Sequence, residues 1–291
     1  MTSGASFNVQ PRVLFELGRV SNLPTVWSNV LAGMVLAGGV LANVPLAIVL
    51  VAASLMYIGG MFLNDAFDAE IDARERPERP IPSGRVSRQA VYVMGYGQLA
   101  LGVVLLTTVA LQAALMGLLL AGAIVLYDAW HKGNAFSPLI MGLCRVLVYA
   151  VAGFATVAEP NPALLWGAVA LLAYLIGLTY LAKQETLGEV KNLWPLAFLA
   201  WPFFFALPAT GAGMVPALIY ITFGAWVIFA LSFVIRQDAR RDVPRAVVSL
   251  IAGISLLDAL FIAWAGAPGL AFVAIACFGL TMGGQQYVKG T

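Results

Sequence analysis

The sequence is dominated by long runs of apolar residues that carry almost no charge. A transmembrane helix needs about 20 predominantly apolar residues, and windows that meet this requirement recur along the whole chain. With 61% hydrophobic and only 10% charged residues, the chain lacks the polar side chains that cover a soluble protein. The composition therefore excludes a soluble enzyme, a nucleic-acid-binding protein and a disordered chain. Apolar and polar residues do not alternate with a period of two, as they would in the strands of a membrane barrel, so the sequence predicts an all-α helical bundle in the membrane.

We expect ten transmembrane helices in a single domain that covers residues 1–291. The apolar windows are 23–42, 45–63, 89–109, 112–128, 138–157, 163–183, 193–209, 214–235, 246–266 and 268–287. Only Ala267, Pro268 and Gly269 separate the last two windows. A single span in this region, giving nine helices in all, is therefore the alternative.

The basic residues are distributed on one side of the predicted membrane. Apart from Arg145, every Lys and Arg lies before span 1, after span 10, or at the connections between spans 2 and 3, 4 and 5, 6 and 7, and 8 and 9. The loops on the other side contain Glu159 as their one charged residue. Because basic residues accumulate in cytoplasmic loops, this pattern predicts that both termini and the basic loops are cytoplasmic.

A group of acidic residues directly follows span 2. Asn64, Asp65, Asp68 and Asp72 are spaced so that their side chains share one face of a helix. Carboxylates this close repel one another, and a bound cation removes the repulsion. Carboxylate and amide oxygens suit Mg²⁺, which often completes its shell with substrate phosphates. The spacing favours a magnesium–diphosphate site about as strongly as its alternative, an ordinary solvated helix end.

The same segment resembles the first aspartate-rich motif, NDxxDxxxD, of the UbiA family of intramembrane prenyltransferases. The continuation from Arg76 to Ser87, RPERPIPSGRVS, is similar to the N-x-x-R-P-I-x-S-G-x-I-S stretch of that family. The segment from Arg19 to Pro24 and Tyr127 at the end of span 4 agree with the same pattern.

The resemblance implies an all-helical bundle, usually of nine helices, around a cavity that is open to lipid. It implies Mg²⁺-dependent transfer of a prenyl group from a prenyl diphosphate to a lipophilic, often aromatic, acceptor within the membrane. The resemblance implies that the metal is held by Asn64, Asp65, Asp68 and Asp72. It also implies that the three aspartates are catalytic. The residues that we expect to contact the substrate are Arg79, Tyr180 and Lys183 from the family motifs, and Lys132 from its position at the cytoplasmic end of span 4.

The second acidic motif of the family is altered in this chain. In the family it follows span 6 and reads roughly Y-x-x-K-D-x-x-D-x-x-x-D. Tyr180 and Lys183 match, whereas other residues occupy the three acidic positions: Gln184, Leu187 and Lys191. We expect Glu185 and Glu189, four residues apart, to hold a second metal ion in a shifted register; the alternative is that the second metal site is lost. The departure suggests a divergent branch, similar to the EboC-like one.

Two charged residues lie well inside predicted spans, away from the span ends. An intramembrane Arg is usually paired or functional, so we expect Arg145 in span 5 to bind diphosphate or an acidic acceptor. Its alternative is to extend to the nearby interface. Asp258 in span 9 is either functional or protonated within the helix packing, and the family motifs do not include it.

A second function remains open from the sequence. The altered second motif and Asp258 are compatible with a non-catalytic or transport protein built on the same bundle. A CDP-alcohol phosphotransferase is not favoured, because its D-G-x-x-A-R pattern is absent. Cys144 and Cys277 lie in apolar runs and indicate neither a disulfide framework nor a metal cluster.

Overall fold

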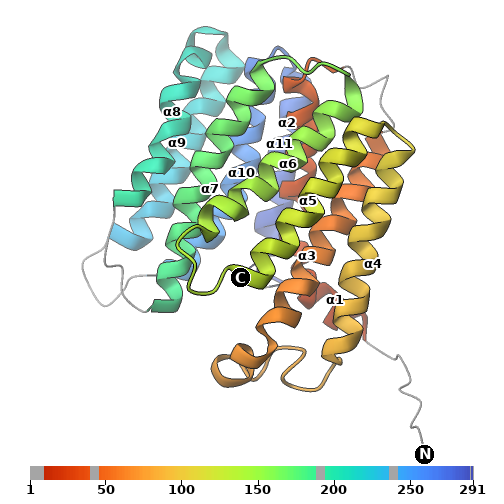
Figure 1. Cartoon of the computed structure of the whole chain (residues 1–291). Helices are drawn as coiled ribbons and strands as arrows, with labels where there is room; N and C mark the ends of the chain where they lie inside the picture. Colours follow the sequence, from red (N-terminus) through yellow and green to blue (C-terminus); the bar gives the residue numbers. More distant parts are fainter. Residues whose placement is uncertain (1–9, 40–45, 188–193, 236–241, 289, 291) are drawn as a thin grey trace, which may run out of the picture.

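The computed structural model describes residues 10–39, 46–187, 194–235, 242–288 and 290. In these ranges helices run side by side in one bundle (Figure 1). In chain order they are α1 (Pro11–Leu17), η1 (Val20–Asn22), α2 (Leu23–Leu36), α3 (Leu46–Glu75), α4 (Arg88–Thr107), α5 (Leu111–Trp130), α6 (Ser137–Thr156), α7 (Ala163–Leu187), η3 (Trp194–Ala200), α8 (Trp201–Ala206), η4 (Leu207–Gly211), α9 (Met214–Ile235), α10 (Val243–Trp264) and α11 (Pro268–Gly284).

The predicted all-α membrane bundle is confirmed. Each of the ten apolar windows contains a helical segment in the part of the chain that the structure describes. Eight of these segments are long and apolar enough to cross a membrane, while α2 and α11 are shorter. The break between α10 and α11 falls at Ala265–Ala267, directly before the Pro268 that begins α11. The last apolar region is thus two helices, as the ten-window arrangement requires.

Helix α3 is longer than the apolar window 45–63 that predicted it. It comprises 30 residues and is therefore about 45 Å long at 1.5 Å per residue, whereas the hydrocarbon core of a bilayer is about 30 Å thick. The helix continues because good helix formers such as Ala66 and Glu70 follow the window, and residues 64–76 contain neither Gly nor Pro. The acidic motif consequently lies on the last turns of one continuous helix.

The window 193–209 forms a broken segment instead of one regular helix. Pro195, Pro202 and Pro208 recur along it. A proline inside a helix lacks the N–H donor and clashes with the preceding turn. The chain accordingly passes through η3, α8 and η4 in succession, packed against α7 and α9.

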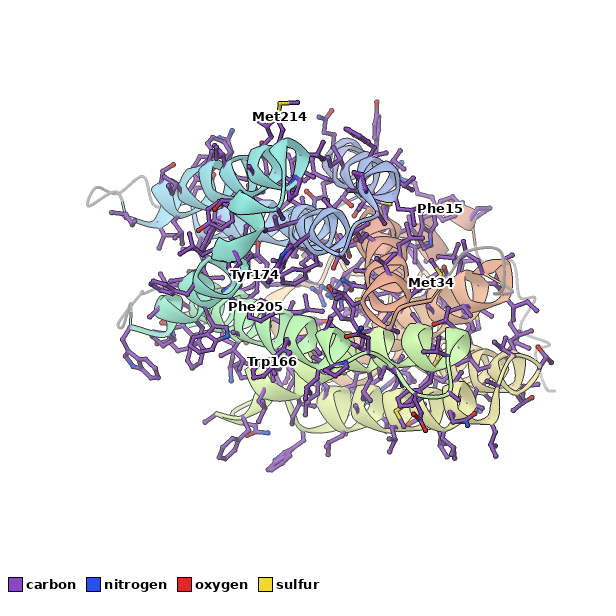
Figure 2. The ribbon with its side chains drawn as sticks, turned by 90° about the horizontal axis from the view of Figure 1, so that it is seen from above. Phe15, Met34, Trp166, Tyr174, Phe205 and Met214 are labelled. Carbon is purple, nitrogen blue, oxygen red and sulfur yellow. The ribbon has the colours of Figure 1, made fainter. Side chains whose placement is uncertain are left out.

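Helix α10 lies in the interior of the bundle, where it packs against α2, α7, α9 and α11. Phe261 on this helix is fully buried. Figure 2 shows Met34 and Tyr174 among the helices, whereas Met214 points away from them. Met214 is 77% exposed, and Leu118 on α5 and Ile228 on α9 are exposed as well. A helix that is apolar on all its faces is buried in protein or in lipid. The outer faces therefore have the character of a lipid-facing surface.

The first and last described residues lie at the end of the bundle that carries the acidic motif. Asn22, at the start of α2, donates from Nδ2 to the carbonyl oxygen of Gly290 at 2.8 Å. Gln285, just after α11, donates to Asn22 Oδ1 at 3.0 Å. Glu16 of α1 pairs with Arg85 in the segment that follows α3. This placement agrees with an even number of passages through the bundle.

Candidate active site

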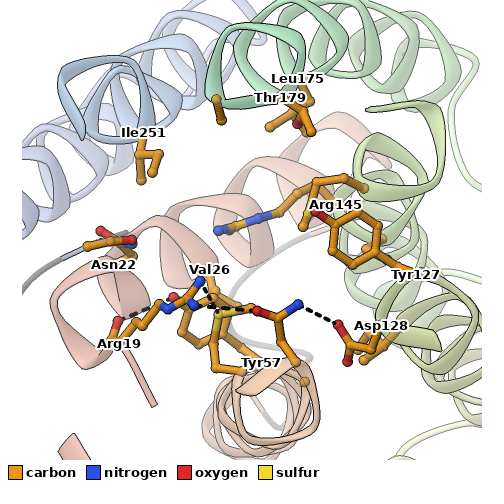
Figure 3. A pocket seen from close by; sticks show the side chains of 18 of the residues that line it. Arg19, Asn22, Val26, Tyr57, Tyr127, Asp128, Arg145, Leu175, Thr179 and Ile251 are labelled. Carbon is orange, nitrogen blue, oxygen red and sulfur yellow. Dashed lines mark hydrogen bonds between the residues drawn. The ribbon is translucent and has the colours of Figure 1, made fainter. Parts of the chain in front are cut away.

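A cavity of about 300 Å³ is formed among α2, α3, α5, α6, α7 and α10 at this end of the bundle (Figure 3). We call the part next to the acidic motif the mouth. Charged and polar lining residues include Asn64, Asp68, Asp72, Arg79, Lys132 and, farther in, Arg145. Apolar lining residues include Val26, Met56, Ile124, Val148, Leu175 and Ile254. The cavity thus combines a charged mouth with a largely apolar interior.

The four motif residues form a buried acidic face on α3. Asn64, Asp65, Asp68 and Asp72 are 8%, 7%, 6% and 4% exposed. Asn64, Asp68 and Asp72 line the cavity, and Asp65 lies beside it, paired with arginines. These exposures are far below those of a solvated helix end, because neighbouring segments cover the motif.

Arg79 reaches the acidic face from the turn that follows α3. Its Nη1 lies 2.9 Å from Asp72 Oδ2 and 3.3 Å from Asp65 Oδ1. Ser83 holds the turn, since both its backbone N–H and its hydroxyl donate to the Arg79 carbonyl oxygen. Gly84 has a φ of 73°, a left-handed conformation that glycine adopts without strain. The turn after the motif therefore places the Arg79 guanidinium next to the carboxylates of Asp65 and Asp72.

Arg19 approaches the same face from the junction of α1 and η1. Its Nη2 lies 3.1 Å from Asp65 Oδ1 and 3.4 Å from Asn64 Oδ1. Its backbone is in the left-handed region, with φ 42°, and its carbonyl oxygen accepts a hydrogen bond from Tyr57. Burial lowers the pKa of Arg19, but the combined attraction of Asp65 and the neighbouring Tyr57, Tyr127 and Asp68 outweighs burial, so the pKa is raised and the guanidinium stays charged. Sequence reasoning noted Arg19 without assigning it a role.

The C-terminal end of α5 supplies a second group of side chains. Lys132 Nζ and His131 Nε2 each lie 3.4 Å from Asp68 Oδ2. Asp128, one turn earlier, is 4% exposed, and its Oδ1 accepts a hydrogen bond from Asn64 Nδ2 at 3.3 Å. Its Oδ2 has no hydrogen-bond partner among the described residues. Asp128 was not among the residues expected to form the site; its position next to Tyr127 was the available signal.

Arg145 lies deeper in the cavity. Its Nη1 donates to Asn29 Oδ1 at 2.9 Å, and its guanidinium carbon lies 5.6 Å from the centre of the Tyr57 ring. Figure 3 shows the guanidinium extending into the open middle of the pocket. Arg145 thus faces the cavity instead of extending to the interface.

The second-motif residues are placed differently. Lys183 Nζ donates to the carbonyl oxygen of Asn134 at 2.6 Å and to Ser137 Oγ at 2.9 Å, so it fastens the end of α7 to the start of α6. Neither Lys183 nor Tyr180 lines the cavity. The side chain of Glu185 and all of Glu189 lie outside the described residues. The structure therefore brings together the first-motif residues with Arg79, Lys132 and Arg145, and does not bring Lys183 and Tyr180 into the cavity.

The oxygen-rich mouth is chemically suited to a hard divalent cation. Asn64, Asp68 and Asp72 line it, and the unpartnered oxygen of Asp128 lies beside Asn64. Among the described residues no three acidic or histidine side chains converge on one point, and the carboxylates contact basic side chains instead. Such a partial ligand set fits Mg²⁺, which is commonly held by a few carboxylates together with water and phosphate oxygens.

Comparisons with known proteins agree with this geometry. Residues 26–185 match the model of the family described as the UbiA prenyltransferase family. Digeranylgeranylglyceryl phosphate synthase of Methanopyrus kandleri is 34% identical over 140 residues, which are 46% of this chain and 47% of that protein. Protoheme IX farnesyltransferase of Alkalihalophilus pseudofirmus is 34% identical over 102 residues, 34% of this chain and 33% of that protein. The matched segment thus spans about half of the first relative's length and a third of the second's.

The fold is also similar to that of solved structures. A UbiA homolog from Archaeoglobus fulgidus, bound to GPP and Mg²⁺, superposes with a TM-score of 0.64 at 15% identity, covering 91% of this chain and 99% of that one. A structure from work on digeranylgeranylglyceryl phosphate synthase in membranes superposes with a TM-score of 0.63 at 18% identity, covering 87% and 97%. At these identities the likeness shows a shared fold.

Proposed function

Because the chain belongs to the UbiA prenyltransferase family, as its match over residues 26–185 shows, we propose that it transfers a prenyl group within the membrane. The donor is a prenyl diphosphate and the acceptor is an aromatic or other lipophilic molecule. The reaction depends on Mg²⁺. The whole of residues 1–291 serves as one transferase domain, with the mouth and both termini on the cytoplasmic side.

The observation that carries this proposal is the division of the cavity into two parts. At the mouth, the acidic face on α3 lies among the cations Arg79 and Lys132, which is the charge arrangement that a metal-bound diphosphate needs. Farther in, apolar side chains such as Ile124 and Leu175 line the wall. A prenyl diphosphate has the same division, with a charged head and an apolar chain, so it fits this cavity in one orientation.

The residues of the mouth have distinct roles in the proposed reaction. Mg²⁺, when bound, would neutralise charge on the departing diphosphate and so favour cleavage of the allylic C–O bond. The residues proposed to hold the ion are Asn64, Asp65, Asp68 and Asp72. Arg79 and Lys132 contact phosphate oxygens, and Arg19 braces Asp65. The apolar interior keeps water away from the prenyl cation until the acceptor attacks it.

The fold neighbour from Archaeoglobus fulgidus that was solved with GPP and Mg²⁺ supports the donor and the cofactor. For the second motif we retain Glu185 and Glu189 as the residues that hold a further Mg²⁺. Lys183 and Tyr180 then act on the substrate from the end of α7, and this role requires Lys183 to exchange its present partner Asn134 for phosphate.

The proposal is tested by a transfer assay on the full chain in lipid nanodiscs. Purified protein is incubated with radiolabelled prenyl diphosphates of several chain lengths, Mg²⁺ and a membrane lipid extract. We expect label to appear in a new lipophilic product, and we expect EDTA to abolish that product.

The second candidate function is a non-catalytic or transport bundle, favoured by the loss of acidic residues at positions 184, 187 and 191. Donor that binds with Mg²⁺ but remains intact across all chain lengths and extracts would support that candidate and refute the enzyme.

A further inference from the structure

Arg145 is a partly buried cation whose remaining donors face the cavity. A guanidinium carries five N–H donors. Among the described residues Arg145 forms one hydrogen bond, to the neutral amide of Asn29, and no ion pair. Its flat group lies over the Tyr57 ring and extends into the middle of the pocket (Figure 3). A partly buried guanidinium that hydrogen-bonds only to a neutral amide favours an anion as its further partner.

A network on α2, α6 and α10 holds Asn29 in a fixed orientation. Asp258 accepts hydrogen bonds from Asn29 Nδ2 at 2.8 Å, from Ser28 at 2.5 Å and from Tyr149 at 2.5 Å. Because the amide nitrogen of Asn29 points to Asp258, its carbonyl oxygen points to Arg145. The carboxyl group of Asp258 contacts these neutral donors and not Arg145, so it orients Arg145 through Asn29 and attracts its charge from beyond that amide.

Arg145 lies too deep to share the diphosphate with the acidic motif. Tyr57, beneath the guanidinium, precedes Asn64 by seven residues, which is about 10 Å along α3. Arg145 itself lies eight residues from the start of α6 at Ser137, or about 12 Å from that end. The cavity wall at this depth is largely apolar, with Val148 one turn beyond Arg145. A diphosphate held by Asp68, at the mouth, would not reach this guanidinium.

We propose that Arg145 binds an anionic group, a carboxylate or a phosphate, on the acceptor molecule. Arginine suits both groups because its planar fork forms paired hydrogen bonds with their oxygens. The Tyr57 ring supplies an apolar face beside the anion, which fits an acceptor with an aromatic or otherwise flat body. This inference rests on the proposed function, since it assigns the second substrate of the same cavity.

The test uses small anions and a neutral analogue as probes. Benzoate, phenyl phosphate and benzamide are titrated separately into the full chain in nanodiscs, with binding followed by calorimetry and by thermal stabilisation. We expect benzoate or phenyl phosphate to bind the wild type more tightly than benzamide does, and the tighter of the two identifies the anion class. The Arg145→Gln variant should weaken the preferred anion by about 10- to 100-fold, the range for a hydrogen bond to a charged group, and leave benzamide unchanged.

Two further variants keep the test decisive. Arg74→Gln removes an exposed arginine on α3 and should bind all probes as the wild type does. Arg145→Lys keeps the charge but loses the planar fork. If Arg145→Gln fails to fold, Arg145→Lys should still fold, and it should bind the anion more weakly than the wild type does. The proposal is overturned if neither anion exceeds benzamide on the wild type, or if folded Arg145 variants bind the anion normally.

Geranyl diphosphate with Mg²⁺ is titrated in parallel to separate the two proposals. Normal donor binding together with absent anion binding overturns the acceptor site alone. Absent donor binding together with Arg145-dependent anion binding counts against the proposed function instead.

Discussion

The substitution Asp68→Asn tests the acidic face, with Glu70→Gln as a matched control two residues later on the same helix. Both variants remove one negative charge and keep the side-chain size. Asp68 lies in the cavity, whereas the Glu70 side chain is 78% exposed and pairs with Arg88 outside it. Any difference in donor binding between the two variants therefore results from the position of Asp68 in the cavity, because the charge of α3 changes equally in both.

The expected effect on stability is small. Asp68 Oδ2 lies 3.4 Å from both His131 and Lys132, and Lys132 is 44% exposed, so the pair with Lys132 contributes about 0–1 kcal/mol. Loss of the charge also relieves repulsion from Asp65 and Asp72, which offsets part of that contribution. We expect the free energy of unfolding of Asp68→Asn to lie within about 1 kcal/mol of that of the wild type.

The expected effect on donor binding is large. A charged partner in a buried site contributes about 1.5–3 kcal/mol, which corresponds to a 10- to 100-fold loss of affinity. Calorimetry with geranyl diphosphate and Mg²⁺ on nanodisc protein should show this loss for Asp68→Asn and no loss for Glu70→Gln. A well-folded Asp68→Asn protein that binds the donor as tightly as Glu70→Gln would falsify the assignment of the acidic face to the diphosphate.

The remaining predictions concern the second motif, the topology and the buried network. Glu185→Gln and Glu189→Gln should each slow donor turnover and be partly rescued by raised Mg²⁺, because each removes a proposed metal ligand while keeping size; normal turnover in both would mean that no second ion is held there. A reporter fused to the C-terminus should be active in the cytoplasm, as the basic loops predict, and activity on the opposite side would contradict the ten-span arrangement. Tyr149→Phe should lower the free energy of unfolding by about 1–3 kcal/mol, because it leaves a buried oxygen of Asp258 without its donor; an unchanged denaturation midpoint would show that the contact is not required.

The fold was largely predictable because lipid exposure and core packing both select apolar residues over the full length of a span. The window 214–235 coincides with α9, which runs from Met214 to Ile235. The predictions differ from the structure where other forces determine the backbone. α3 continues past its window because its polar end keeps helix-forming residues, and the window 193–209 is broken by Pro195, Pro202 and Pro208.

Spacing alone could group the residues of the candidate site only where they share one helix, whereas Arg79 came from the family resemblance. Asn64 and Asp68 could be grouped from spacing alone, because a four-residue step places them on one face. Arg19 and Asp128 reach the same face because α1, η1 and α5 pack against α3. The spacing of residues along one helix cannot predict such contacts between helices. The network that fixes Arg145 likewise joins three helices, so its direction into the cavity became visible only in the folded chain.

The most direct test of the central claim is a structure of the protein in nanodiscs with Mg²⁺ and a prenyl thiodiphosphate, in which sulfur replaces the bridging oxygen and slows cleavage. We predict density for the diphosphate between the acidic face on α3 and the side chains of Arg79 and Lys132, with the prenyl chain along Ile124 and Leu175. Well-occupied donor density at any other place, with this cavity empty or filled by lipid, would contradict the account.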